Sequence, residues 1–257
     1  MNLILLGPPG SGKGTQAKML FEKYDLMHIS TGETFRELLK TNNPLAKEVK
    51  KYVERGLFVP DDIVMKVVSN RVDQGDCIKN GFLLDGFPRN LSQAKFLNKH
   101  LTQKDRKIDN VIYLELSNQT IIDRLSSRFI CPSCGANYNL ISQPPKSDKK
   151  CDSCGAELVQ RKDDMVEVVK RRLDIYKNET FPLIKYYKMK KIPRSPDSIH
   201  RGYTLGHLSH AVRLKRTIRR DSRKRDFQVK HLLVKINAEN NVEEVFKDIC
   251  NAINNKS

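Results

Sequence analysis

Short, continuously apolar runs and amphipathic stretches alternate along this chain and predict strands and helices. The run NLILL near the N-terminus ends in a glycine, which is typical of a buried parallel strand. After a glycine-rich loop, Ala17, Leu20, Phe21 and Tyr24 recur at helical spacing and predict one apolar helix face. Strand, glycine loop and helix therefore follow one another at the start of the chain.

Two later segments carry similar signals. The run FLL at residues 82–84 predicts a buried strand, and Asp85 stands at its carboxyl end. In open α/β sheets that edge is where ligands bind, so Asp85 either orders the waters of a bound Mg²⁺ or caps the following helix. The segment LLVKINAENNVEEVF predicts a strand followed by a helix.

Composition limits the cellular setting. The apolar content is 39%, and no window approaches the roughly 18 to 20 apolar residues that a membrane span needs. The apolar start is too short for a secretory signal and runs directly into a glycine loop. We therefore expect a soluble cytoplasmic protein with no membrane partner, whose six cysteines are reduced unless a metal holds them.

The positive charge is concentrated in one segment. The chain carries a formal net charge of +17, which invites a nucleic-acid interpretation. Residues 189–231 hold 13 Lys and Arg against 3 Asp, which leaves only +7 for the remainder. That remainder is ordinary for an enzyme whose substrates are polyphosphates.

The stretch GPPGSGKGTQ has the pattern of a phosphate-binding loop. Gly7, Gly12 and Lys13 fit G-x-x-x-x-G-K between the predicted strand and helix, although a chance glycine turn is the alternative. Backbone N–H groups and the helix N-terminus then face the phosphates, while Lys13 neutralises their β and γ oxygens. The motif requires Ser or Thr after the lysine, but Gly14 is there and Thr15 follows. We therefore expect the contact with Mg²⁺ to run through water.

Four cysteines have the spacing of a structural zinc site. CPSCGA and CDSCGA place two C-x2-C pairs 16 residues apart, at Cys131, Cys134, Cys151 and Cys154. Four thiolates arranged in this way can form the tetrahedron that zinc prefers, with no open position for catalysis. The alternative is two disulfides in a secreted protein. Cys77 and Cys250 stand alone and are expected to be buried thiols.

Together the motifs GPPGSGKGTQ, STGETFR, DGFPRN and RKDD resemble the adenylate kinase family, in its form with a zinc-binding lid. The resemblance covers about residues 1–188 and 231–257. It implies an α/β P-loop nucleoside monophosphate (NMP) kinase fold, with a parallel sheet flanked by helices. The implied core comprises residues 1–29, 61–125, 164–188 and 231–257, with an NMP-binding arm at 30–60 and a zinc-containing lid at 126–163. The implied reaction is transfer of the γ-phosphoryl group of ATP to AMP, giving two ADP, by a monomer that uses Mg²⁺.

The resemblance also implies the site residues. For ATP these are Gly10, Ser11, Gly12, Lys13, Gly14, Thr15, Arg128, Asn137, Tyr138 and Asn240. For AMP they are Thr31, Arg36, Leu57, Phe58, Val59, Gly86, Phe87, Pro88, Arg89, Gln93, Arg161 and Arg172. The catalytic set is Lys13, Asp85, Arg89, Arg124, Arg128, Arg161 and Arg172, and Asp163 and Asp164 order the arginines.

Three of these residues also have interpretations that do not depend on the family resemblance. Thr31 follows Ser30 in a capping box and could simply belong to a helix start. Arg124 and Arg128 are four residues apart and are expected on one helix face, where each taken singly could be a solvated charge.

No general base is apparent, and this chemistry needs none, because the acceptor phosphate is already an anionic nucleophile at neutral pH. Catalysis then consists of alignment and charge stabilisation, and a closing lid excludes water.

Residues 189–230 interrupt the family pattern as a basic insertion. They are either a tolerated surface loop or an arm for nucleic acid or an acidic partner, and we expect the loop. Two rival functions remain open. One is a kinase for UMP, CMP or GMP, and the other is a P-loop protein that binds nucleic acid through the insertion.

Overall fold

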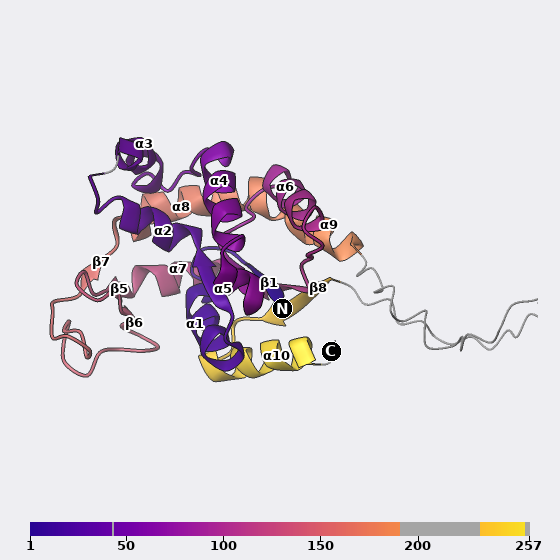
Figure 1. The fold of residues 1–257 in the computed structure, drawn as a ribbon. Helices are drawn as coiled ribbons and strands as arrows, with labels where there is room; N and C mark the ends of the chain where they lie inside the picture. The colour runs from indigo at the N-terminus through magenta and orange to yellow at the C-terminus, as the bar shows by residue number, and fades with distance from the viewer. Residues whose placement is uncertain (43, 191–231, 255–257) are drawn as a thin grey trace, which may run out of the picture.

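A computed structural model describes residues 1–42, 44–190 and 232–254. Five parallel strands form a central sheet in the order β2-β3-β1-β4-β8, with helices on both faces (Figure 1). Three short antiparallel strands form a second sheet in the order β6-β5-β7, which projects to one side of the first (Figure 1). The predicted α/β fold with a parallel sheet is confirmed.

The strands are β1 (Asn2–Leu6), β2 (Met27–Ser30), β3 (Phe82–Asp85), β4 (Asn110–Glu115), β5 (Arg128–Ile130), β6 (Asn137–Asn139), β7 (Val159–Gln160) and β8 (Leu233–Asn237). The helices are α1 (Lys13–Tyr24), α2 (Thr31–Leu38), α3 (Pro44–Val53), α4 (Asp61–Val72), α5 (Gly75–Lys79), α6 (Leu91–Thr102), α7 (Asn118–Ser126), α8 (Val166–Ile175), α9 (Pro182–Met189) and α10 (Val242–Asn254). A 3₁₀ turn, η1 (Lys162–Asp164), precedes α8, and a π turn, η2 (Tyr176–Thr180), separates α8 from α9.

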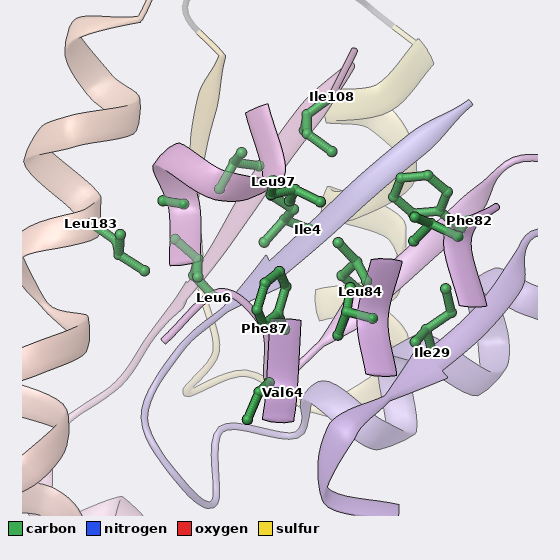
Figure 2. Packing of buried hydrophobic residues seen from close by; sticks show 14 of the residues in the cluster. Ile4, Leu6, Ile29, Val64, Phe82, Leu84, Phe87, Leu97, Ile108 and Leu183 are labelled. Carbon is green, nitrogen blue, oxygen red and sulfur yellow. The ribbon is translucent and has the colours of Figure 1, made fainter. Parts of the chain in front are cut away.

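The alternation of side chains along β1 separates two cores. Leu3 and Leu5 point to the face covered by α1 and α10, because consecutive strand residues point to opposite sides of a sheet. Ile4 and Leu6 point to the other face, where they pack with residues of α4, α6 and α9 (Figure 2). All four side chains are buried on these two faces, which explains why the run is apolar throughout.

The predicted strands at both ends of the chain and at residues 82–84 are confirmed. The helix after the glycine loop is also present, and Ala17 and Leu20 are fully buried on it. Phe21, which was predicted on the same apolar helix face, is not buried, because 43% of its surface is exposed. Cys77 and Cys250 are buried thiols, as expected.

The expectation that Arg124 and Arg128 share a helix face is wrong. Helix α7 ends at Ser126, and Arg128 is the first residue of β5. The Ser127 hydroxyl donates a 2.6 Å hydrogen bond to the Asp123 carbonyl. This side-chain bond satisfies one of the last carbonyl groups of the helix. Residue spacing in the sequence could not show where this helix stops.

Residues 191–231, which hold most of the predicted insertion, lie outside the described part of the chain. The two residues that flank them are hydrogen-bonded to each other, because the Leu232 N–H donates to the Lys190 carbonyl at 3.3 Å. The described residues before and after this segment therefore lie next to each other. Within the described ranges, the helices are all too short or too polar to cross a bilayer.

Candidate functional site

The glycine loop joins β1 to α1 at the carboxyl edge of the central sheet. Gly10 and Gly12 have φ angles of 81° and 84°, a backbone conformation that favours glycine. At Gly7, a Cβ atom would lie 2.6 Å from Ser11 Oγ and 2.9 Å from the Leu114 carbonyl oxygen. The loop sequence is thus required by its backbone shape, and the N-terminus of α1 opens toward it.

Lys13 is held across this loop. Its Nζ donates to the carbonyls of Gly7 and Pro8 at 2.9 and 2.8 Å, and to Ser11 Oγ at 3.3 Å. Burial lowers the pKa of Lys13 to about 8, although the attraction of Asp85 opposes the shift. Of the other residues predicted here, Ser11 is buried, Gly14 follows on α1 and Thr15 is exposed.

Asp85 ends β3 and faces the loop. Burial raises its pKa, but the His28 ring and the Lys13 ammonium outweigh that effect and hold the pKa below its usual range. His28 Nε2 lies 3.8 Å from Asp85 Oδ2. A Cβ atom at Gly14 would lie 3.9 Å from the same oxygen, so the glycine leaves this side of the carboxylate uncovered. An ionised carboxylate beside a phosphate loop can hold a hydrated cation.

A cavity opens beside the loop, between α2, α4 and α8. Its border includes most of the residues predicted for AMP, namely Thr31, Arg36, Leu57, Phe58, Val59, Gly86, Arg89, Gln93 and Arg172. Sequence reasoning missed Gly32, Phe35, Val53, Gly56 and Val64, which also border it. In the sequence these five look like ordinary helix and turn residues. Asp163 also borders the cavity, although the sequence predicted for it only a contact with the arginines.

Thr31 and Arg89 meet at one carbonyl. Thr31 Oγ1 and Arg89 Nε both donate to the Gly86 carbonyl, each at 2.9 Å. Gly86 has a φ of 78°, and a Cβ atom there would lie 2.9 Å from Thr31 Oγ1. Ser30, rather than Thr31, caps α2, since its side chain accepts from the Glu33 N–H. The Thr31 hydroxyl is therefore not a helix cap.

Two of the residues predicted for AMP belong to the core. Phe87 is fully buried and lies among Leu6, Val64 and Leu84 (Figure 2). Pro88 follows it and is also buried. Neither side chain borders the cavity, so any contact from this stretch of the loop runs through the main chain.

The arginines near the cavity are paired with two aspartates. Arg128 forms a two-point ion pair with Asp164, whose side chain is fully buried. Arg172 Nη1 donates to Asp163 Oδ2 at 3.1 Å and to Asp164 Oδ1 at 3.2 Å. Arg161 Nε lies 3.6 Å from Asp163 Oδ1 and is buried without a hydrogen-bond partner. Both aspartates thus form ion pairs with these arginines, which is the arrangement that the expected ordering role requires.

The same group of charges produces a strongly positive site. Burial and the neighbouring Arg172 lower the pKa of Arg89 to about 10, so this side chain stays cationic at neutral pH. Burial and Arg128 lower the pKa of Arg161 to about 10 in the same way. Mutual repulsion among buried cations favours an anionic ligand between them. Phosphate, which accepts several charge-assisted hydrogen bonds, is the matching chemistry.

Arg124 lies apart from this group. Its Nη2 donates to the Ala238 carbonyl at 2.8 Å, in the turn between β8 and α10 that also contains Asn240. Gln16 of α1 donates to the Val242 carbonyl at 2.9 Å, which holds the same turn against the helix of the glycine loop. The turn that contains Asn240 therefore lies against α1, and the contact of Asn240 with ATP stays a prediction.

Four cysteines gather on the small sheet. Their sulfur atoms all lie within 4.8 Å of one another, and the Cys131–Cys154 and Cys134–Cys151 pairs are 3.4 and 3.5 Å apart. A tetrahedral zinc with bonds of about 2.3 Å needs sulfur separations of about 3.8 Å, whereas a disulfide needs about 2.05 Å. The spacing therefore fits zinc, and it does not fit the two disulfides.

Each cysteine pair has the same backbone turn. The Gly135 N–H donates to the Cys131 carbonyl at 3.0 Å, and the Gly155 N–H donates to the Cys151 carbonyl at 2.8 Å. Both glycines have φ angles above 70°, at 75° and 72°. The Gly that follows each second cysteine is thus required by the turn.

Asn137 and Tyr138 lie on β6 beside the cysteines. Tyr138 Oη is 3.5 Å from Cys151 Sγ and accepts a hydrogen bond from the Asp152 N–H at 2.8 Å. Asn137 is exposed and donates to the Gly135 carbonyl at 3.3 Å. In this conformation both residues serve the small sheet, and neither borders the cavity beside the glycine loop.

Comparison with known proteins agrees with these features. A family model described as adenylate kinase matches residues 5–192. An adenylate kinase of Clostridium perfringens is 49% identical over 191 residues, covering 74% of this chain and 88% of the relative. One from Caldicellulosiruptor saccharolyticus is 50% identical over 190 residues, with 74% and 88% covered. Another, from Caldanaerobacter subterraneus subsp. tengcongensis, is 47% identical over 192 residues, with 75% and 86% covered.

Proposed function

The chain belongs to the adenylate kinase family and is a nucleoside monophosphate kinase, and we propose that it transfers the γ-phosphoryl group of ATP to AMP, giving two ADP. One observation carries the proposal. Three arginines, Arg89, Arg128 and Arg172, lie close enough to Lys13 of the phosphate loop to lower its pKa, and two of them, Arg89 and Arg172, border the neighbouring cavity. Two anionic substrates that meet at this point would be neutralised together.

The proposed donor side is the glycine loop. Its N–H groups and Lys13 would hold the phosphates of ATP, while Asp85 would hold the waters of a bound Mg²⁺. The Mg²⁺ ion would supply positive charge to the phosphates during transfer. The turn that contains Asn240 borders α1, which supports a place for the adenine of ATP there.

The proposed acceptor side is the cavity. Arg36 and Arg89 would hold the phosphate of AMP, since a guanidinium donates two parallel hydrogen bonds to it. Thr31, the apolar turn at residues 57–59 and Gln93 would surround the base. The acceptor phosphate needs no general base, so the residues of the chain align the two substrates and stabilise the transferred charge.

The small sheet is the proposed lid. Residues 126–163 would close over both nucleotides and exclude water, while residues 30–60 form the NMP-binding arm and the remaining described residues form the core. On closing, Arg128, Arg161 and Arg172 would exchange carboxylate partners for phosphate oxygens. Activity as a monomer is part of the same proposal.

The cysteine cluster of this lid would hold one structural zinc ion. Four thiolates complete the coordination, so the ion would stabilise the small sheet and take no part in phosphoryl transfer. This role fits the position of the cluster, which lies outside the cavity border.

A coupled assay with AMP, UMP, CMP and GMP as acceptors tests the function. Rapid ATP-dependent turnover with AMP alone is the expected result. Preference for UMP, CMP or GMP would place the chain in the same family with a different acceptor. Turnover with none of the four would contradict the proposal.

A further inference from the structure

The amide of Gln93 is held by the protein at both ends. Its Oε1 accepts a 2.7 Å hydrogen bond from the Arg89 main-chain N–H, and its Nε2 donates a 2.7 Å hydrogen bond to Asp61 Oδ1. Asp61 also accepts from Asn90 Nδ2 at 3.0 and 3.1 Å. Gln93 is 1% exposed, so water does not compete for these bonds.

These two partners permit only one orientation of the amide. The Arg89 N–H can only donate, and an ionised carboxylate can only accept. If the amide turned over, its NH₂ would face another N–H and its oxygen would face the Asp61 carboxylate. Both hydrogen bonds would be lost and replaced by repulsive contacts.

The orientation of Gln93 decides which base edge it can pair with. Gln93 borders the cavity, and its two protein bonds leave one N–H and one oxygen lone pair unused. The adenine edge offers an acceptor at N1 and a donor at its 6-amino group, which can pair with that N–H and that lone pair. The edges of guanine and hypoxanthine are reversed, with a donor at N1 and an acceptor at O6, and they require the amide to turn over.

We propose that Asp61 is a specificity-positioning residue, which together with the Arg89 N–H fixes the Gln93 amide to favour 6-amino over 6-oxo purine monophosphates. The inference rests on the proposed function, because it assumes that the acceptor enters this cavity. Asp61 does not touch the base and acts through Gln93.

Helix capping explains only part of this arrangement. Asn90 Oδ1 accepts from the Gln93 N–H at 2.9 Å, so the Arg89–Gln93 bond resembles the second half of a capping box at the start of α6. Asp61 itself lies in the first turn of α4, where a negative charge is favourable. Neither role requires the bond between Asp61 and Gln93 Nε2, which joins residues 32 positions apart.

The experiment measures kcat and KM for AMP and for IMP, which carries the 6-oxo edge without the 2-amino group of guanine. We expect the wild-type protein to favour AMP strongly, and Asp61→Ala to reduce the AMP/IMP ratio of kcat/KM by about tenfold or more, mainly through KM. Asp62→Ala is the matched control, because it removes an exposed charge from the same turn of α4. It should leave the ratio unchanged.

Asp61→Ser is the second variant, because serine favours a helix start while its hydroxyl can either donate or accept. It should relax the ratio in the same direction, and thermal melting shows whether each variant is folded. An unchanged ratio in the folded variants, or a wild-type protein that uses IMP within twofold of AMP, overturns the inference and leaves the proposed function intact. A wild-type protein that does not phosphorylate AMP overturns both.

Discussion

The Thr180 hydroxyl donates a 2.7 Å hydrogen bond to the main-chain carbonyl of Arg89, a residue 91 positions earlier in the chain. Thr180 is the last residue of the π turn between α8 and α9, and only 7% of it is exposed. Helix α8, on the other side of that turn, carries Arg172. One part-buried hydrogen bond therefore joins the helix that follows the proposed lid to the arginine at the proposed acceptor site.

Thr180→Val should lower kcat several-fold, because the Arg89 carbonyl loses this hydrogen bond and the guanidinium is less firmly placed. Thr180→Ser keeps the hydroxyl and is the matched control. Steady-state kinetics with thermal melting separate the two effects. If the valine variant melts lower but retains the kcat of the serine variant, the bond serves stability alone.

Lys13→Met should reduce turnover about a hundredfold or more, because it removes the only cation within the glycine loop itself. The side-chain length is retained, and the fold should survive as judged by circular dichroism. Lys18→Met, on the same helix outside the glycine loop, is the control and should be active. Turnover of Lys13→Met within a few-fold of wild type would contradict the assignment.

The pH dependence should follow the pKa of Lys13, which burial lowers to about 8. Below that pH the free protein carries the ammonium that attracts phosphate, and above it the charge is lost. We expect kcat/KM for ATP to fall up to about tenfold per pH unit above 8, while kcat changes less because bound phosphate favours the charged form. A flat kcat/KM profile from pH 7 to 10 would show that Lys13 stays charged.

Zinc removal should lower the melting temperature while the central sheet stays folded, because four thiolates lose the ion that holds the small sheet together. Elemental analysis should find one zinc per chain. Cys131→Ser should abolish that zinc, whereas Ser133→Ala, between two of the proposed ligands, should retain it. Metal-free protein with an unchanged melting temperature would rule out a structural role.

Removal of residues 191–231 should leave kcat and both KM values within about twofold of wild type. A short glycine-serine linker can replace them, since Lys190 and Leu232 are hydrogen-bonded to each other. Activity and binding to a short RNA or DNA duplex are measured on both proteins. Loss of activity with the fold intact would give the segment a part in the reaction, and loss of a measurable duplex affinity would support the nucleic-acid alternative.

Local motifs were readable because their geometry depends on neighbours in the chain. The glycine loop needs positive φ angles at Gly10 and Gly12, and the two cysteine turns need them at Gly135 and Gly155. Buried strands such as NLILL need apolar side chains on both faces of a covered sheet. Each of these requirements leaves a fixed spacing or a continuous run that is visible without the fold.

Contacts between distant residues were not readable, because they depend on where several elements meet. Asp61 carried no functional prediction, yet it holds Gln93. Arg124 and Arg128 are spaced as on one helix face, yet the helix ends between them. Arg124 donates to the Ala238 carbonyl, and Arg128 pairs with Asp164.

The sequence by itself thus determined the phosphate loop, the cysteine cluster and the parallel sheet, since each is encoded within a short stretch. Only the tertiary structure decided which arginines meet which aspartates and which way the Gln93 amide points. Those choices depend on burial and charge pairing between segments far apart in the chain, which no local pattern records.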